Sequence, residues 1–287
     1  MELNPLEVCD LTYSYNKHLV LDGLDLEVRK GEIIGILGPN GCGKTTLLRN
    51  LNKNLSPESG CVLMDGLDIA DMPKKDIAKT MAVVPQTNEI RFSFTVREIV
   101  SMGRMPFQGL MDPESRSDAE LIDSAIEKVG LAHMKDRYIS TMSGGERQRV
   151  MIARALAQTP EILLMDEPTL HLDISTQFEA LDLVSKLSKE NGMTVVIVSH
   201  DLPMVAKYCD RVAMIKDHKV MCCGTLEEVL TPDNMRQVFN VDAELGTDSK
   251  TGEKTVFLHG VAKQEPNKRC DGFGEKTVIP YDIAKSN

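Results

Sequence analysis

Residues 38–45 read Gly-Pro-Asn-Gly-Cys-Gly-Lys-Thr, which matches the phosphate-loop pattern G-x-x-x-x-G-K-[ST]. The apolar, β-branched run before it predicts a buried strand, and the residues after it predict a helix that begins near Lys44. Glycines let the backbone turn its N–H groups onto phosphate oxygens, which the positive end of the helix dipole also attracts. The residues expected to hold a nucleotide here are Gly38, Pro39, Asn40, Gly41, Cys42, Gly43, Lys44, Thr45 and Thr46.

A second apolar run, residues 161–165, predicts another buried strand that ends in two acids, Asp166 and Glu167. An acid at the carboxyl end of a strand beside a phosphate loop can hold Mg²⁺, and Thr45 offers a hydroxyl to the same ion. Lys44 supplies a positive charge for the β- and γ-phosphates. Glu167, on the other side of the strand end, is expected to polarise an attacking water. Together the two motifs predict a nucleoside triphosphatase.

Between these motifs, residues 141–149 read Thr-Met-Ser-Gly-Gly-Glu-Arg-Gln-Arg. Taken alone, Ser143 followed three residues later by Glu146 predicts an ordinary helix N-cap. Taken with the other motifs, the segment resembles the signature of the ATP-binding cassette family, the nucleotide-binding subunits of ABC transporters. The resemblance extends from about Leu6 to Leu245. It implies an ATPase whose two copies pair face to face, so that Ser143, Gly144 and Gly145 of one copy meet the ATP of the other.

The same resemblance assigns roles to further residues. Gln86 resembles the glutamine that touches Mg²⁺ and leads into the helical subdomain, and His200 resembles the histidine that contacts the γ-phosphate. Asp173 resembles the acid that organises the dimer interface. Tyr15 resembles the aromatic residue that stacks on adenine, although Tyr13 is an alternative.

At one position the sequence departs from the family's pattern. Leu170 stands where the family more often has a small or polar residue. A leucine there would either tighten the seam between two copies or pack inward. The sequence therefore does not decide between these two geometries of the interface beside the expected hydrolytic site.

The predicted fold class is α/β, a P-loop NTPase (RecA-like) core with a mostly parallel sheet. An antiparallel β edge is expected over the first 30 residues, and an α-helical subdomain is expected as an insertion at about 90–157. We expect residues 1–230 to form one nucleotide-binding domain. Residues 231–287 are expected to be a partly ordered C-terminal appendage without a site.

Composition narrows the function classes. The formal net charge of −10 over 287 residues argues against nucleic acid as a partner, because phosphate backbones attract basic surfaces. The seven cysteines include no C-x-x-C pair, which favours free thiols in a reducing compartment. No run approaches the roughly 20 apolar residues that a membrane-spanning helix needs, and no basic, apolar leader opens the chain. We therefore expect a peripheral protein on the cytoplasmic face of the cell membrane.

Three segments, residues 94–100, 103–106 and 224–231, resemble the importers of iron–siderophore complexes, haem and cobalamin. The resemblance implies a homodimer of ATP-hydrolysing subunits that bind ATP and Mg²⁺ and serve two integral membrane permease subunits. An extracytoplasmic substrate-binding protein would be an indirect partner. The alternatives are a soluble ABC-type ATPase without a permease, for example in cofactor or iron–sulfur assembly, an exporter, and a phosphate-loop kinase outside the family. No residue points to a particular cargo.

Overall fold

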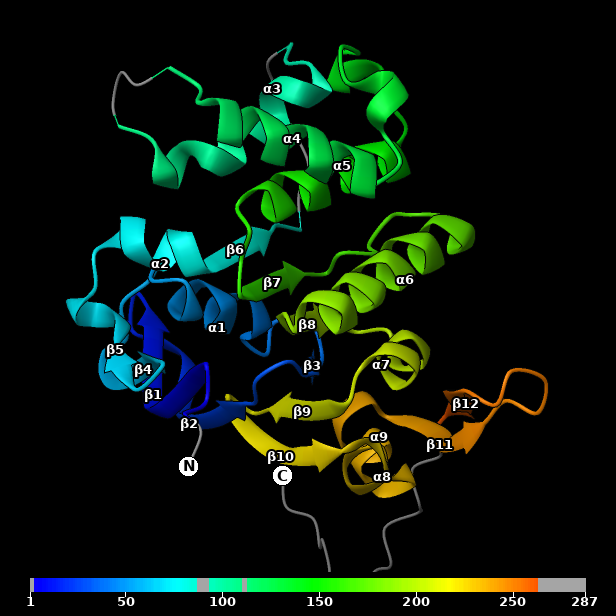
Figure 1. The fold of residues 1–287 in the computed structure, drawn as a ribbon. Helices are drawn as coiled ribbons and strands as arrows, with labels where there is room; N and C mark the ends of the chain where they lie inside the picture. The colour runs from blue at the N-terminus through cyan, green and yellow to red at the C-terminus, as the bar shows by residue number, and fades with distance from the viewer. Residues whose placement is uncertain (1–2, 87–92, 110–112, 263–287) are drawn as a thin grey trace, which may run out of the picture.

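The computed structural model describes residues 3–86, 93–109 and 113–262 (Figure 1). Its central sheet has six strands: β3 (Ile33–Leu37), β6 (Met81–Val84), β7 (Ile162–Asp166), β8 (Thr194–Ser199), β9 (Arg211–Lys216) and β10 (Lys219–Thr225). Their order is β10-β9-β3-β8-β7-β6, and only the pair β9–β10 is antiparallel. The carboxyl ends of the parallel strands therefore meet at one edge, where open α/β sheets bind ligands. This mostly parallel sheet confirms the predicted fold class.

The central strands are apolar at consecutive positions because both faces of the sheet are covered. In β3, Ile33 and Leu37 belong to one hydrophobic core, while Ile34 and Ile36 belong to the other, and all four are buried. β8 divides in the same way between the two cores. Burial on both faces is the usual environment of parallel strands, and it explains why these segments read as apolar runs without alternation.

A second sheet supplies the predicted antiparallel edge. Its strands are β1 (Leu6–Tyr15), β2 (His18–Val28), β4 (Ser59–Met64) and β5 (Leu67–Asp68), in the order β2-β1-β4-β5. Asn16 and Lys17 join β1 to β2 with φ angles of 48° and 70°, as in a type I′ hairpin turn. β2 lies against the phosphate loop, because a Cβ atom on Gly43 would lie 2.8 Å from the carbonyl oxygen of Val20.

Helices cover the central sheet and form a separate layer beyond it (Figure 1). The helices are α1 (Lys44–Leu51), α2 (Lys74–Thr80), α3 (Val96–Ser101), α4 (Arg116–Lys128), α5 (Gly144–Ala157), α6 (Ile174–Asn191), α7 (Leu202–Tyr208), α8 (Leu226–Val229) and α9 (Pro232–Phe239). Short 3-10 turns occur at Ile69–Asp71, Met102–Phe107, Ala132–Met134 and Ile139–Thr141. α3, α4 and α5 pack on one another within the segment where the sequence predicts a helical subdomain. In the three described stretches, no helix has both the length and the apolar character that crossing a bilayer requires.

The chain beyond residue 230 packs on the main body. A hairpin of β11 (Val241–Thr247) and β12 (Lys254–Val261) lies against α7 and α9. Met235 of α9 and Val256 of β12 are buried in the same core as the central sheet. A domain boundary at 230 therefore remains a prediction, and residues 263–287 of the expected appendage lie outside the described residues.

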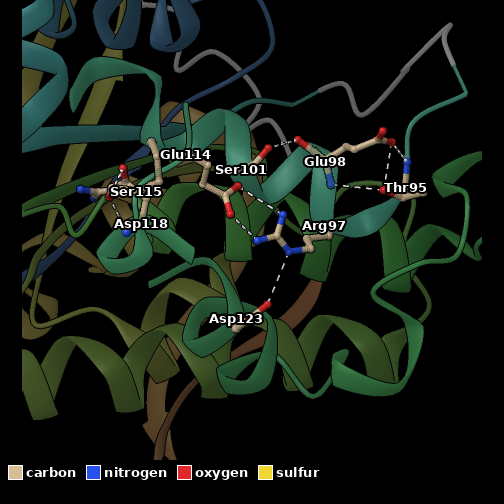
Figure 2. A network of polar contacts seen from close by, with 9 residues as sticks. Thr95, Arg97, Glu98, Ser101, Glu114, Ser115, Asp118 and Asp123 are labelled. Carbon is tan, nitrogen blue, oxygen red and sulfur yellow. Dashed lines mark hydrogen bonds and ion pairs between the residues drawn. The ribbon is translucent and has the colours of Figure 1, made fainter. Parts of the chain in front are cut away.

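A buried ion pair holds the helical subdomain together. Arg104 Nε donates to Asp118 Oδ1 at 2.7 Å, and Arg104 Nη1 donates to the carbonyl oxygen of Ala157 at 2.9 Å. Both side chains of the pair are nearly buried, at 7% and 11% exposure. A neighbouring pair, Arg97 of α3 with Glu114, is about one-third exposed, and Arg97 also reaches towards Asp123 of α4 (Figure 2).

These two pairs make a matched test of stability. Arg104→Met should lower the free energy of unfolding by about 3–5 kcal/mol, because it leaves the Asp118 carboxylate buried without its cation. Arg97→Met should lower it by about 1 kcal/mol or less, because solvent screens an exposed pair. Urea denaturation followed by circular dichroism measures both. Equal losses in the two variants would contradict the role given to the buried pair.

Candidate functional site

The phosphate loop joins β3 to α1 in a conformation that requires its glycines. A Cβ atom on Gly38 would lie 2.5 Å from the carbonyl oxygen of Ile215 and 2.6 Å from the sulfur of Cys42. Gly41 and Gly43 have φ angles of 82° and 104°, in the region that favours glycine. α1 begins without a side-chain cap, so no capping side chain occupies its first N–H groups. These groups can bind an anion.

The lysine of the loop is held by the loop itself. Lys44 Nζ donates to the carbonyl oxygens of Gly38 at 2.7 Å and Pro39 at 3.1 Å, and the residue is buried. A phosphate would offer the ammonium group charged acceptors in place of these neutral ones, and charge-assisted hydrogen bonds are the stronger kind.

The end of β7 meets the start of α1. Thr45 Oγ1 donates to Asp166 Oδ1 at 3.1 Å, and Asp166 is buried. Burial raises the pKa of the Asp166 carboxyl; the hydrogen bond from Thr45 opposes that rise, and the nearby charge of Glu167 adds to it. A hydroxyl beside two acids is a set of hard oxygen donors. This corner of the site therefore favours a divalent cation.

Glu167 has a left-handed backbone conformation, and its side chain hydrogen-bonds one other side chain. Its φ angle is 47°, and its N–H donates to the carbonyl oxygen of Val198 at 2.9 Å. Its side chain is buried, and Oε2 lies 2.7 Å from Nδ1 of His200, which is half-exposed beyond the end of β8. Left-handed backbone at a non-glycine residue outside a hairpin turn is uncommon, and such strain clusters at functional sites. The carboxylate is thus held at the sheet edge beside Asp166.

The serine-glycine-glycine segment forms the N-terminus of α5. Ser143 and Glu146 make a reciprocal capping box, with Ser143 N donating to Glu146 Oε2 at 2.7 Å. A Cβ atom on Gly145 would lie 2.3 Å from Cγ2 of Thr176 at the start of α6. Within the described residues, no hydrogen bond or ion pair joins residues 143–145 to the phosphate loop.

Asp173 caps α6 immediately beside that segment. Its carboxylate accepts hydrogen bonds from Ser175 Oγ at 2.7 Å, Thr176 N at 3.0 Å and Thr176 Oγ1 at 2.9 Å. These hydrogen bonds, the one from Ser175 first, lower the pKa of Asp173 to about 2. Asp173 is thus ionised over the whole physiological range.

This low pKa has a consequence for stability. Because the folded-state pKa of Asp173 is below its ordinary value of 3.8, the charged cap stabilises the fold above about pH 4, and the contribution is lost as pH falls towards 2. The melting temperature of the wild type should exceed that of Asp173→Ala at pH 7 and pH 5 by the same margin, and by less at pH 3. Asp173→Asn, which keeps a neutral cap, should show a margin over Asp173→Ala that does not depend on pH. A wild-type margin that grows on acidification would contradict this assignment.

The remaining predicted residues lie on several elements of the fold. Gln86 is exposed just beyond β6, the parallel neighbour of β7, and directly precedes the gap at 87–92. Tyr13 and Tyr15 stack edge to face near the β1–β2 turn with ring centroids 4.9 Å apart, and Tyr15 is the more exposed. Leu170 is half-buried in the turn after Glu167. Its burial does not distinguish a leucine that tightens the seam between two copies from one that packs inward.

Two features of the site escape sequence reasoning. The bond between Glu167 and His200 depends on the pairing of β7 with β8, which no local pattern predicts. Thr176 does not belong to any of the sequence motifs. Its side chain nevertheless leaves no room for a Cβ atom at position 145, which is why a glycine is needed there. The only sequence signal for Thr176 is its place three residues after the cap at Asp173.

Known proteins are similar to this chain in sequence and in fold. A family profile described as "ABC transporter" matches residues 21–170. The iron(3+)-hydroxamate import ATP-binding protein FhuC of Bacillus subtilis (strain 168) is 40% identical over 92% of this chain and 98% of its own length. The ferric enterobactin transport ATP-binding protein FepC of Escherichia coli (strain K12) is 35% identical over 87% of this chain and 92% of its own.

Solved structures agree. A chain of an inward-facing ABC transporter described as being of metal-chelate type superposes with a TM-score of 0.78 at 26% identity, and covers 89% of this chain and 97% of its own. CbiO1 of Clostridium perfringens, part of the ABC transporter complex CbiONQ, has a TM-score of 0.72 at 32% identity, with coverage of 83% and 95%. The likeness extends well beyond the three motifs.

Proposed function

This chain belongs to the ABC transporter family, and on that premise we propose that it is the ATP-hydrolysing subunit of an importer for an iron chelate or cobalamin. One observation carries the proposal: the fold gathers Lys44, Thr45, Asp166 and Glu167 at the carboxyl edge of the central sheet. These are the groups needed to bind a triphosphate and to attack its terminal phosphate with water. The import role is supported by the relatives, which are ATP-binding subunits of siderophore and cobalamin importers.

ATP would bind across the phosphate loop and the antiparallel edge. The free N–H groups at the start of α1 and the Lys44 ammonium would hold the phosphates. The adenine would stack on the tyrosine pair of β1, and the greater exposure of Tyr15 favours that ring over Tyr13. The phosphate tail and the base would then lie on neighbouring elements, since β2 contacts Gly43.

The acidic corner fits Mg²⁺. Thr45 Oγ1 and Asp166 Oδ1 lie 3.1 Å apart, and burial beside Glu167 disfavours a second negative charge unless a cation is near. Thr45, Asp166 and Gln86 are the residues that would hold the ion. When bound, Mg²⁺ would neutralise the negative charge that develops on the phosphate oxygens.

Hydrolysis needs a base for the attacking water, and Glu167 is the residue placed for it. Its carboxylate is buried, fixed by His200 and adjacent to the acid that would face the cation. His200, with Nδ1 engaged by Glu167, orients that carboxylate and can present its other ring nitrogen to the γ-phosphate. Glu167 would accept the proton as the water oxygen bonds to phosphorus and the β–γ bridge breaks.

The signature segment would act on the other copy of a homodimer. Because no hydrogen bond of the described residues joins residues 143–145 to the phosphate loop of their own chain, the N–H groups of Gly144 and Gly145 would be available to a second nucleotide. Asp173, beside them and ionised, would organise the seam. Closure of the pair would then depend on ATP, and phosphate release would reopen it.

The wider assembly is a further part of the proposal. Two permease subunits would span the membrane, with this chain peripheral on the cytoplasmic face and a substrate-binding protein acting on the far side. Gln86 and the helical subdomain would pass the closing motion to the permease. The relatives support this arrangement, because two of them are described as import ATP-binding proteins and a third as a transport ATP-binding protein.

A pull-down tests the transport role. Tagged Glu167→Gln protein is incubated with detergent-solubilised membranes, with and without ATP–Mg²⁺, and bound partners are identified by mass spectrometry. Recovery of a polytopic permease supports the importer. Recovery of soluble proteins alone, with ATP-dependent dimerisation intact, would overturn the transport role in favour of a soluble ABC-type ATPase.

A further inference from the structure

Cys9 of β1 and Cys61 of β4 lie directly opposite each other in the antiparallel ladder. Such partners have Cα atoms about 4.5 or 5.5 Å apart, depending on whether the pair is hydrogen-bonded. Both separations fall within the roughly 4.4–6.8 Å that a disulfide spans. The register of these two strands therefore gives a Cα spacing compatible with a covalent link.

The two thiols share the outer face of the sheet. Val8 and Val62, the preceding pair in the ladder, are buried in the core, so Cys9 and Cys61 point the other way and are only half-buried. Both cysteines are free thiols, and they occupy facing positions on adjacent strands. A small reagent can reach this pair, because it does not lie inside the core.

We propose that Cys9 and Cys61 are a redox modification site, a dithiol that exchanges with small-molecule disulfides to form a reversible cross-strand bond. A thiolate of the pair attacks one sulfur of the small disulfide, forms a mixed disulfide and releases one small thiolate. The second cysteine then loses its proton and attacks the protein-bound sulfur. The second small thiol leaves, so two protein thiols are oxidised and one small disulfide is reduced to two thiols.

The surroundings of Cys9 disfavour its thiolate. Burial raises the pKa of Cys9, and the thiol of Cys61 and the carboxylates of Glu7 and Asp25 raise it further. Cys9 is therefore less readily ionised than an ordinary thiol.

The Cys9–Cys61 disulfide would restrain an irregular part of the sheet. The β1–β4 register shifts just after Cys9, where Asp10 has a φ angle of 49°. Gly60 is packed so closely that a Cβ atom there would lie 2.4 Å from the carbonyl oxygen of Cys9. The closed loop, residues 9–61, would also contain the whole phosphate loop. Such a link constrains the unfolded chain and should stabilise the oxidised protein.

Thiol mapping of the full-length protein tests this proposal independently of its ATPase role. The reduced protein is equilibrated with glutathione and glutathione disulfide at increasing ratios, quenched with acid, alkylated and analysed as intact protein and as peptides. The expected product has lost two hydrogens, yields a peptide pair linked through Cys9 and Cys61, and reverts with dithiothreitol. Its melting temperature should rise by about 5 °C or more.

Single variants provide the controls. Cys9→Ser and Cys61→Ser should each give only a glutathione adduct on the remaining cysteine and no rise in melting temperature, and Cys9→Ala or Cys61→Ala replaces either one if it does not fold. Cys222→Ser, on β10, should behave as the wild type. The proposal is overturned if the wild type forms only glutathione adducts at positions 9 and 61. It is equally overturned if the disulfide maps to other cysteines, such as Cys222 with Cys223.

Discussion

Glu167→Gln should bind ATP with nearly unchanged affinity, hydrolyse it about 10²–10⁴-fold more slowly, and accumulate as a dimer when ATP–Mg²⁺ is present. Glutamine keeps the shape of the side chain and can still bond His200, but it cannot accept a proton from water. The ATP-bound pair would therefore close without the step that reopens it. Phosphate release measures the rate, and size-exclusion chromatography with light scattering measures the dimer.

Glu32→Gln is the matched control for this result. Glu32 is also a buried carboxylate with a side-chain partner, since it accepts a hydrogen bond from Arg211 Nη1 at 3.0 Å. It lies before β3, at the end of the sheet opposite the site, so its loss should lower stability and leave the rate per folded molecule unchanged. Full hydrolysis by Glu167→Gln, or equal loss in both variants, would remove Glu167 from the role of base.

Lys44→Ala should weaken ATP binding by about 10- to 100-fold or more, because charge-assisted hydrogen bonds to phosphate contribute about 1.5–3 kcal/mol each. The lysine is held by the carbonyl oxygens of Gly38 and Pro39, so it is already in place when the phosphates arrive. Titration calorimetry or a fluorescent ATP analogue measures the affinity.

Lys53→Ala is the control for the lysine. Lys53 Nζ also donates to two backbone carbonyl oxygens, those of Ala70 and Met72, each at 2.7 Å. Both variants lose the same kind of backbone contact, but only Lys44 lies in the phosphate loop. If Lys53→Ala lost ATP affinity to the same extent, the effect would be one of general stability and not of phosphate binding.

Much of the fold follows from local patterns. β3 and β8 are buried at every position and are mostly apolar, and the glycines of the phosphate loop occupy positions with left-handed backbone or close backbone contacts. The packing of the C-terminal hairpin could not be predicted, because β12, whose Val256 belongs to the main core, packs against α7, which is distant in sequence. Local periodicity contains no information about such a partner.

The candidate site divides in a similar way. The identities of Lys44 and Asp166 come from motifs whose chemistry is clear in the sequence alone. The hydrogen-bond partners of the site residues cannot be identified from motifs. The carbonyl oxygens that accept from Lys44 depend on the loop's conformation, and the hydrogen bond between Glu167 and His200 depends on which strands are neighbours. The motifs identify the chemistry, and only the fold gives the geometry.

The central claim is that each ATP site is shared between two copies, and a heterodimer tests it most directly. Glu167→Gln and Ser143→Arg subunits, each inactive as a homodimer, are co-expressed with different tags and purified as the mixed pair. Ser143 is exposed, so an arginine there should fold, as thermal melts of that variant will verify, and should obstruct only the partner's nucleotide.

In the mixed pair, one site has both lesions and the other has none. If the sites are shared, ATP hydrolysis should return to well above either homodimer. If each site lies within one chain, both subunits stay defective, and the heterodimer should remain as inactive as its parents although it binds ATP.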